Sequence, residues 1–342
     1  MGSKFFRKLP TPKEIKEQFP IPEAVAKKKL ENDETIKNIF AGKDDRFMMV
    51  IGPCSADNPD AVKEYIHRLA KVQEEIKDKV FIIPRVYTNK PRTTGKGYKG
   101  MLHQPDPEKT SDLLGGLISI RDLFTSIMEE TGFGIADEML YPENTRYFTD
   151  CLSYVAVGAR SVEDQQHRLV ASGMDIPVGM KNPSSGDISI MLNSIEAAQA
   201  SHSFIYRGWD VETDGNPYAH AILRGALNQY GKSVPNYHYE DVVSLYDKYM
   251  AKGFANPSVI IDCNHYNSDK KYKEQLRIAK EVLHNREHNE DQKAFVKGLM
   301  VESYLVEGNQ PIDEHTYGKS ITDPCIGWDD TEYLLKKVAD LV

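Results

Sequence analysis

A cysteine and a series of charged residues, each close after an apolar run, offer the clearest chemistry in this sequence. Cys54 follows the run FMMVIG, in the segment IGPCS at 51–55. Later apolar runs of strand length end on Arg, Lys, Glu, His or Asp. Parallel strands of a barrel bring their C-terminal ends to one mouth, and barrel enzymes carry their catalytic residues there. These residues are therefore candidates for a single active site.

Six cations form the first chemical group at these positions. Arg matches carboxylates and phosphates with parallel hydrogen bonds, and Lys supplies a point charge. Cations gathered in one cavity repel one another unless several negative charges bind among them. We therefore expect the site to take two anionic substrates or one bisphosphate. The six cations are Arg85, Lys90, Arg92, Arg160, Lys181 and Arg224.

A thiol, an imidazole and two carboxylates form the second group, namely Cys54, His265, Glu302 and Asp323. Sulfur and nitrogen combined with oxygen ligands suit Mn²⁺, Fe²⁺, Co²⁺ or Zn²⁺ better than Mg²⁺ or Ca²⁺. The four residues come from distant segments, so their spacing alone is a weak signal. Cys263, two residues before His265, is expected to lie one layer deeper and to pack in the core.

The bulk composition excludes several classes of function. The chain has 342 residues, 40% of them hydrophobic, and a formal net charge of −8. Such an acidic chain does not offer the basic surface that nucleic acids require. The sequence has no apolar run long enough for a membrane span and no signal peptide, so we expect a cytoplasmic protein. Four cysteines in a chain of this length do not make a disulfide framework, and the absence of a CxxC pair argues against a thiolate zinc site.

Apolar runs alternate with amphipathic segments and predict an α/β fold, a (β/α)8 TIM barrel over 46–342 with an N-terminal extension. The runs are almost continuously apolar, as parallel strands covered on both faces are. The expected strands are 47–53, 80–87, 133–140, 154–160, 177–182, 202–207, 258–265 and 296–302. The expected helices lie near 60–77, 110–131, 142–152, 162–172, 189–200, 239–252, 271–285 and 329–342.

Two segments are expected to lie outside the repeating pattern. Residues 1–45 are rich in Lys, Glu and Pro, with a helix near 22–40, and should pack on the barrel or on a partner subunit. Residues 208–238 are polar and contain Gly and Pro, so we expect an excursion there, as a hairpin, after the sixth strand.

Several motifs make nearly the whole chain resemble the type I alpha 3-deoxy-D-arabino-heptulosonate-7-phosphate (DAHP) synthases of the shikimate pathway. The last two motifs are the most specific to this family. The motifs are GPCS at 52–55, RVYTNKPRTT at 85–94, GAR at 158–160, GMKN at 179–182, ILRG at 222–225, MVESYLVEGNQ at 300–310 and YGKSITDPCIGW at 317–328.

The resemblance implies a role for each matching residue. Cys54, His265, Glu302 and Asp323 match the metal ligands of the family. Arg92 and Thr93 match the element that holds the aldose phosphate, and Glu138 and His167 match polar groups near the reacting centre. The positions that hold phosphoenolpyruvate in the family are matched by Arg85, Lys90, Arg160, Lys181 and Arg224.

The resemblance also implies a reaction. Phosphoenolpyruvate condenses with D-erythrose 4-phosphate and water to give DAHP and phosphate, with a divalent metal ion as Lewis acid at the aldehyde oxygen. Lys90 is our candidate for protonating the new alkoxide, because a lysine among arginines is expected to have a lowered pKa. The family resemblance and the N-terminal helix together suggest a homodimer or homotetramer.

Three alternatives remain open. A related synthase that uses another aldose phosphate carries KANRS-like sequence where this chain has KPRTT at 90–94. GKGYKG at 95–100 has the glycine spacing of a dinucleotide site, but the expected strand ends near Tyr87 and the following MLHQPDP cannot open a helix. A non-catalytic barrel with a structural metal leaves the cations unexplained.

One departure from the family concerns regulation. The excursion between Phe204 and Arg224 is shorter than in feedback-regulated relatives, where it forms part of the cavity for an aromatic amino acid. We therefore expect weak or absent inhibition by Phe, Tyr or Trp. The loop that contains GKGYKG is also longer than in the enteric enzymes.

Overall fold

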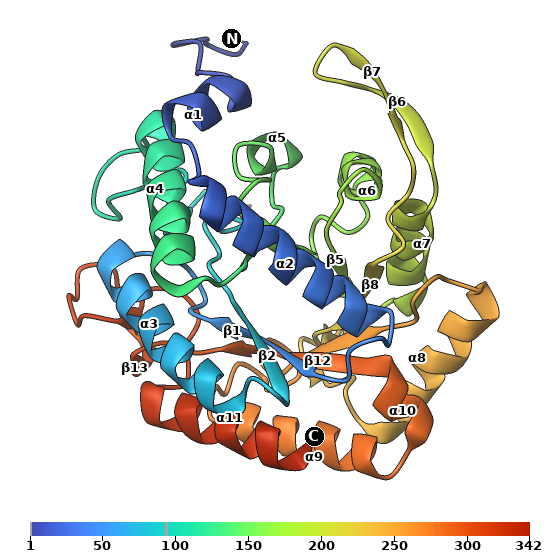
Figure 1. Cartoon of the computed structure of the whole chain (residues 1–342). Coiled ribbons are helices and arrows are strands. Elements are labelled where there is room, and N and C mark those ends of the chain that lie inside the picture. Colours follow the sequence, from blue (N-terminus) through green and yellow to red (C-terminus); the bar gives the residue numbers. More distant parts are fainter. Residues whose placement is uncertain (1, 93–94) are drawn as a thin grey trace.

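A closed parallel barrel forms the centre of the computed structural model, which describes residues 2–92 and 95–342 (Figure 1). Its eight strands have the order β2-β1-β12-β11-β8-β5-β4-β3. A parallel bridge between Arg85 and Ala136 joins the two ends of the sheet, so the predicted (β/α)8 barrel is confirmed. The strands are β1 (Phe47–Gly52), β2 (Val80–Pro84), β3 (Ile135–Glu138), β4 (Leu152–Val157), β5 (Val178–Lys181), β8 (Ala219–Leu223), β11 (Val259–Asp262) and β12 (Val296–Glu302).

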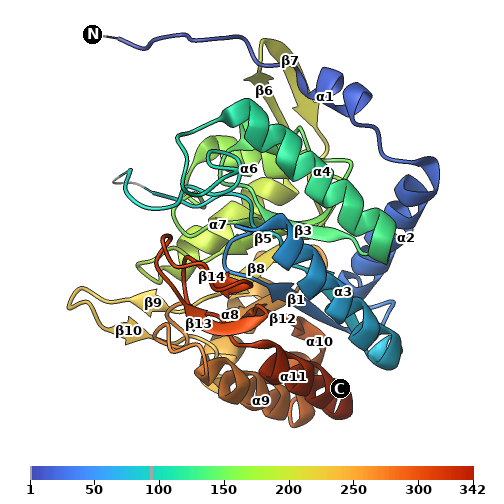
Figure 2. The same ribbon diagram turned by 90° about the vertical axis from the view of Figure 1, so that its left-hand side faces the viewer.

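Helices follow the strands and pack around the barrel (Figures 1 and 2). The expected helix at 142–152 is wrong in length, because it ends after Thr145 and the chain continues in turns that bury Tyr147 and Phe148. The helices are α3 (Pro59–Ile76), α4 (Leu113–Thr131), α5 (Pro142–Thr145), α6 (Gln165–Ser172), α7 (Ile188–Gln199), α8 (Tyr239–Lys252), α9 (Glu274–Glu287), α10 (Glu290–Phe295) and α11 (Trp328–Leu341). No helix of the described part of the chain is long and apolar enough to cross a membrane.

The sixth barrel strand is not the expected segment 202–207. That segment forms β6 (His202–Tyr206), which pairs with β7 (Trp209–Thr213) in an antiparallel hairpin outside the barrel. The barrel position belongs to β8, which pairs in parallel with β5 and β11. All of β8 is buried, whereas β6 alternates between exposed and partly buried residues, as a strand covered on one face does. The remaining short strands are β9 (Ala226–Leu227), β10 (Ser233–Val234), β13 (Val306–Asn309) and β14 (Lys319–Ser320).

The N-terminal segment closes one end of the barrel. It forms α1 (Pro12–Gln18) and α2 (Glu23–Phe40), and α2 lies across the barrel (Figure 1). Ile36, Ile39 and Phe40 are buried in one cluster with side chains of the barrel interior, including those on β1, β8 and β12. The Phe40 ring lies 4.2 Å from the ring of His220 on β8. The contacts of α2 therefore complete the interior at the N-terminal ends of the strands.

Candidate active site

The predicted chemistry gathers around one cavity of about 130 Å³ at the C-terminal ends of the barrel strands. Parallel strands place their last residues at this mouth, which is why residues distant in sequence meet there. Glu302, the last residue of β12, lies beneath the cavity and is fully buried. The predicted residues that line the cavity are Cys54, Arg85, Lys90, Arg92, Glu138, Arg160, Lys181, Arg224, His265 and Asp323.

Cys54 reaches the mouth because β1 ends on a glycine. A Cβ atom at Gly52 would lie 2.2 Å from the carbonyl oxygen of Arg85, so a larger residue would separate β1 from the end of β2. The buried Cys54 Sγ lies 3.2 Å from Nζ of Lys90. Burial raises the pKa of the Cys54 thiol, and the carboxylate of Glu302 adds to this rise.

Three of the four predicted metal ligands form a compact group. One ligand atom each of Cys54, Glu302 and Asp323 lies within 4.8 Å of the other two. The fourth, His265, borders this group, with its Nε2 at 3.9 Å from Oε1 of Glu302. Asp323 also accepts a hydrogen bond of 3.0 Å from Lys270, a residue that the sequence did not single out.

Asp262 supports two of the predicted residues and was missed. It is the last residue of β11 and is fully buried, with Oδ2 at 2.8 Å from Nδ1 of His265 and at 3.3 Å from Nζ of Lys181. Burial alone would raise the pKa of Asp262, but His265 and Lys181 outweigh it and hold the pKa below its usual range. The contact between Asp262 and Nδ1 of His265 is close but lacks hydrogen-bond geometry within the described residues, and Nε2 of His265 lies 3.9 Å from Oε1 of Glu302.

Glu302 is held by an arginine and an amide. Its Oε1 accepts a hydrogen bond of 2.6 Å from Nη2 of Arg85, and its other oxygen accepts one from Asn264. Burial alone would raise the pKa of Glu302, but the Arg85 guanidinium outweighs burial and lowers the pKa to about 2. Glu302 is therefore an ionised, fully buried carboxylate beside Cys54.

Two arginines at the mouth have buried N–H groups without partners. Nε and Nη1 of Arg85 and Nη1 of Arg224 have no hydrogen-bond partner within the described residues. The guanidinium groups stack instead on Tyr87 at 3.9 Å and on Tyr266 at 4.8 Å from the ring centroids. Buried donors are almost always paired, so these groups indicate an anion that binds between them.

The two lysines at the mouth differ in pKa. Burial alone would lower the pKa of Lys90, but the adjacent Cys54 together with the carboxylates of Glu302 and Glu138 outweighs burial and raises it. The expectation of a lowered pKa for Lys90 is therefore wrong. Burial lowers the pKa of Lys181, although Asp262 opposes the change.

Three predicted site residues remain, namely Glu138, His167 and Thr93. Glu138 lines the cavity, beside Gly158, where a Cβ atom would meet its Oε1 at 2.6 Å. His167 is buried next to the cavity wall, with Nδ1 at 2.7 Å from Asp164 Oδ1 and Nε2 at 3.0 Å from the carbonyl oxygen of Leu140, which lines the cavity. Both ring nitrogens thus face protein acceptors, and a catalytic role for His167 stays a prediction. Thr93 lies outside the described residues.

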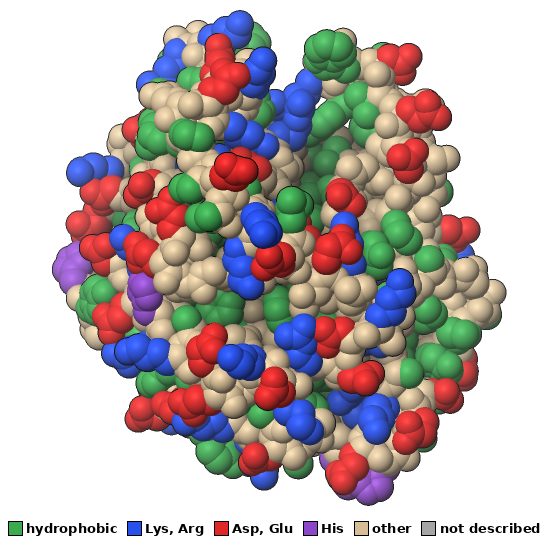
Figure 3. Space-filling model, in the orientation of Figure 1, with side chains coloured by type: hydrophobic (Ala, Val, Ile, Leu, Met, Phe, Trp, Pro, Cys, Tyr) green, Lys and Arg blue, Asp and Glu red, His purple; other side chains and the backbone are tan. Residues whose placement is uncertain are grey.

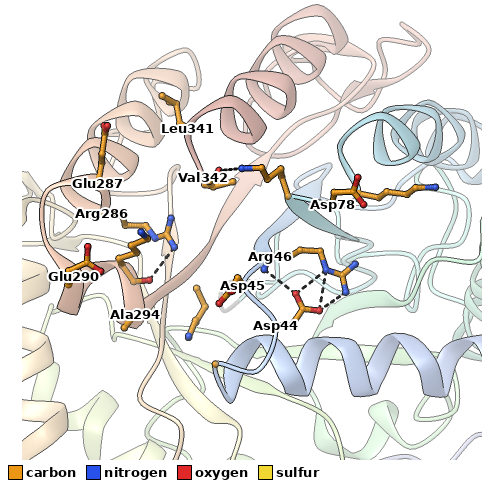
Figure 4. Close-up of a pocket in the computed structure, with 15 residues that line it drawn as sticks. Asp44, Asp45, Arg46, Asp78, Arg286, Glu287, Glu290, Ala294, Leu341 and Val342 are labelled. Carbon is orange, nitrogen blue, oxygen red and sulfur yellow. Dashed lines mark hydrogen bonds and ion pairs between the residues drawn. The ribbon is translucent and has the colours of Figure 1, made fainter.

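A larger cavity of about 850 Å³ lies at the other end of the barrel, before the first residues of β1 and β2 (Figure 4). Asp44 accepts four hydrogen bonds from the side chain and backbone of Arg46, and the shortest, from Nη2, measures 2.6 Å. Lys79 donates to the carbonyl oxygen of Val342 at 2.7 Å. Arg46 and Lys79 thus have protein partners, unlike the buried N–H groups of Arg85 and Arg224 at the mouth.

A closed parallel barrel with its reactive groups at the C-terminal strand ends defines the class of (β/α)8-barrel enzymes. The profile of the DAHP synthetase I family matches residues 21–336, so the chain belongs to this family. It is 40% identical to the Phe-sensitive phospho-2-dehydro-3-deoxyheptonate aldolase of Escherichia coli strain K12, over 99% of this chain and 96% of that protein.

Two further relatives agree with this assignment. A phospho-2-dehydro-3-deoxyheptonate aldolase of Haemophilus influenzae is 40% identical over 95% of this chain and 89% of its own length. The solved structure of a phospho-2-dehydro-3-deoxyheptonate aldolase from Francisella tularensis superposes with a TM-score of 0.92 at 32% identity, covering 100% of this chain and 98% of that chain.

Proposed function

We propose that this chain condenses phosphoenolpyruvate with D-erythrose 4-phosphate and water, in a metal-dependent reaction that gives DAHP and inorganic phosphate. The observation that carries the proposal is the set of unpaired, buried guanidinium donors of Arg85 and Arg224 at a mouth lined by six predicted cations. Two phosphorylated substrates, one of which is also a carboxylate, supply the negative charge that these groups lack. The names of the relatives support the same reaction.

The cations bind and orient the substrates. In this proposal Arg85, Lys90, Arg160, Lys181 and Arg224 hold phosphoenolpyruvate, and Arg92 with Thr93 holds the phosphate of the aldose. Carbon 3 of phosphoenolpyruvate then attacks the aldehyde carbon, water adds to carbon 2, and phosphate leaves by cleavage of its C–O bond. Holding two anions that otherwise repel each other contributes through proximity and preorganised charge.

The residues at the mouth fit a divalent ion. Cys54, Glu302 and Asp323 offer ligand atoms within 4.8 Å of one another, and Nε2 of His265 lies 3.9 Å from Oε1 of Glu302. A sulfur, an imidazole and two carboxylates are the donor set expected for Mn²⁺, Fe²⁺, Co²⁺ or Zn²⁺. An ion held there supplies Lewis acidity at the aldehyde oxygen.

Lys90 is proposed as the group that protonates the new alkoxide. Its raised pKa keeps the Lys90 amine protonated, so a proton is present to donate. Its Nζ lies 3.2 Å from Cys54 Sγ, so the donor and the proposed metal ligands share one corner of the cavity. Glu138 and His167 are proposed as further polar groups of the reaction, His167 acting through Leu140 on the cavity wall.

A phosphate-release assay tests the reaction. We expect release only when phosphoenolpyruvate, erythrose 4-phosphate and a divalent ion such as Mn²⁺ are all present, and loss of release after exhaustive chelation. Turnover with arabinose 5-phosphate in place of erythrose 4-phosphate would favour the related synthase. Full turnover of the chelated, metal-free protein would contradict the proposed role of Cys54 and its neighbours.

Self-association and location are proposed as well. The N-terminal extension, residues 1–45, exposes Phe5 and Phe6 almost completely, and the β6–β7 hairpin exposes Ile205 and Trp209. Exposed apolar side chains of this size are typical of surfaces that bind another chain, which favours a homodimer or homotetramer. All four cysteines are buried and unpaired, which suits the reducing cytoplasm.

A further inference from the structure

A second group of metal-binding side chains lies at the C-terminal end of α9, where Glu287 lines the large cavity at the end of the barrel opposite the mouth. His284, Glu287 and His288 are exposed, and one ligand atom of each lies within 4.8 Å of the other two. Their spacing of three and four residues brings them to one face of the helix. Histidine side chains are exposed at the lower edge of the molecule, where α9 and α10 lie in the same view (Figures 1 and 3).

One of the two imidazoles has a fixed tautomer. Nδ1 of His288 lies 2.8 Å from the carbonyl oxygen of His284. A carbonyl only accepts, so Nδ1 carries the proton and Nε2 keeps its lone pair. A hydrogen bond from the other ring nitrogen to a backbone carbonyl is typical of metal-binding histidines. The two rings are already close, with centroids 4.3 Å apart.

Glu287 is available as the third ligand. The side chain of the neighbouring Arg286 donates hydrogen bonds to the carbonyl oxygens of Val296 and Lys293. Figure 4 shows Arg286 pointing into the large cavity. No ion pair joins Glu287 to a Lys or Arg within residues 2–92 and 95–342. The carbonyl groups that end α9 carry partial negative charge, which adds to the attraction for a cation.

We propose that His284, Glu287 and His288 bind a divalent first-row transition ion, with water completing its coordination. Two imidazoles and a carboxylate suit Zn²⁺, Ni²⁺, Co²⁺ or Cu²⁺, whereas Mg²⁺ and Ca²⁺ prefer sites made of oxygen. The group differs from the mouth in having no sulfur ligand. The proposal does not depend on the proposed reaction, and the two can fail separately.

Equilibrium dialysis of the full chain against Ni²⁺ tests the proposal. We expect the double variant His284→Ala, His288→Ala to lose one bound equivalent, and Glu287→Gln to bind that equivalent at least ~10-fold more weakly. Turnover in Mn²⁺ should be unchanged in all of these variants. His315→Ala is the matched control, because His315 is 72% exposed and lies 3.6 Å from Glu108 but has no imidazole neighbour in the group.

Cobalt spectroscopy separates the two sites. Co²⁺ bound through Cys54 gives a thiolate charge-transfer band, which the double variant should retain at full intensity because the α9 group has no sulfur. Equal Ni²⁺ stoichiometry and affinity in wild type and the double variant would overturn the proposal, as would an equal loss in His315→Ala. If circular dichroism shows that the double variant is misfolded, Glu287→Gln decides the outcome alone.

Discussion

The two ends of the barrel differ in how their charges are neutralised. The cavity at the C-terminal ends is small, about 130 Å³, and contains buried arginine N–H groups without partners. The cavity at the N-terminal ends is larger, about 850 Å³, but Arg46 and Lys79 there are paired with Asp44 and Val342. The interior behind it is filled by α2. Buried N–H groups without partners therefore locate the candidate site better than cavity size does.

Removal of Glu302 should have the largest effect, because it disturbs both the metal ligands and a buried ion pair. In Glu302→Ala the fully buried Arg85 loses its only carboxylate partner within the described residues, which costs about 3–5 kcal/mol of unfolding free energy. Metal affinity and turnover should also fall, by at least ~100-fold. Urea denaturation and metal titration measure the two effects. Unchanged metal affinity in Glu302→Ala would show that Glu302 is not a metal ligand.

Truncation of Phe40 should destabilise the other end without changing substrate binding. Phe40 is 2% exposed and packs inside the barrel, so Phe40→Ala should cost about 3–5 kcal/mol of unfolding free energy. The matched control is Tyr230→Ala, because Tyr230 is 83% exposed and its truncation should change stability by less than ~0.5 kcal/mol. KM for both substrates should stay the same in the folded fraction. A raised KM in Phe40→Ala would show that the two ends are coupled.

His220 should make the stability of the N-terminal end dependent on pH. Burial lowers the pKa of His220 from 6.5 to about 4, so the unfolded chain binds a proton that the folded chain does not. Stability is then fully present above pH 6.5 and is lost as the pH falls toward 4, by about 3 kcal/mol in total. His220→Gln should lack this part of the acid dependence in urea denaturation. An identical pH profile in the variant would contradict the assignment.

A pair of arginine variants gives the smallest effects and the most direct comparison of the two ends. Arg224→Ala removes an unpaired donor at the mouth and should weaken phosphoenolpyruvate binding by about 10–100-fold, as loss of a charged hydrogen bond does. Arg46→Ala removes a paired cation at the other end and should cost at most ~1 kcal/mol of unfolding free energy, with KM unchanged. Measurement of KM for both variants tests the contrast. Equal changes in KM in the two variants would show that the pairing of the arginine does not distinguish the two ends of the barrel.

Residues at the ends of strongly apolar strands could be predicted from the sequence. Cys54, Lys181 and Glu302 each end or follow a run whose burial is visible as apolar composition, so the barrel order places them at one mouth. The strand β8 could not be found in this way, because a histidine interrupts its short apolar run, AHAIL. The ring nitrogens of His220 find partners in Tyr154 and the Tyr218 carbonyl once the barrel has formed.

Supporting residues were the least predictable part of the site. Asp262 lay inside a predicted strand and could have been found as the polar residue in an apolar run. Lys270 follows a segment with two residues in the left-handed region, His265 and Asp269, and nothing in the local pattern indicates that it turns back to Asp323. Tertiary contacts alone decide its position.

The packing of the C-terminal end of α2 against the barrel interior also constrains the order of folding. Ile36, Ile39 and Phe40 are synthesised early, yet they pack in the same cluster as Met300 on β12, the last strand of the barrel. Contacts between such distant segments form slowly, because the intervening chain must first be ordered. The apolar end of α2 therefore stays exposed during translation until nearly the whole chain has emerged, and this interval is when the chain is most open to aggregation or to capture by a chaperone.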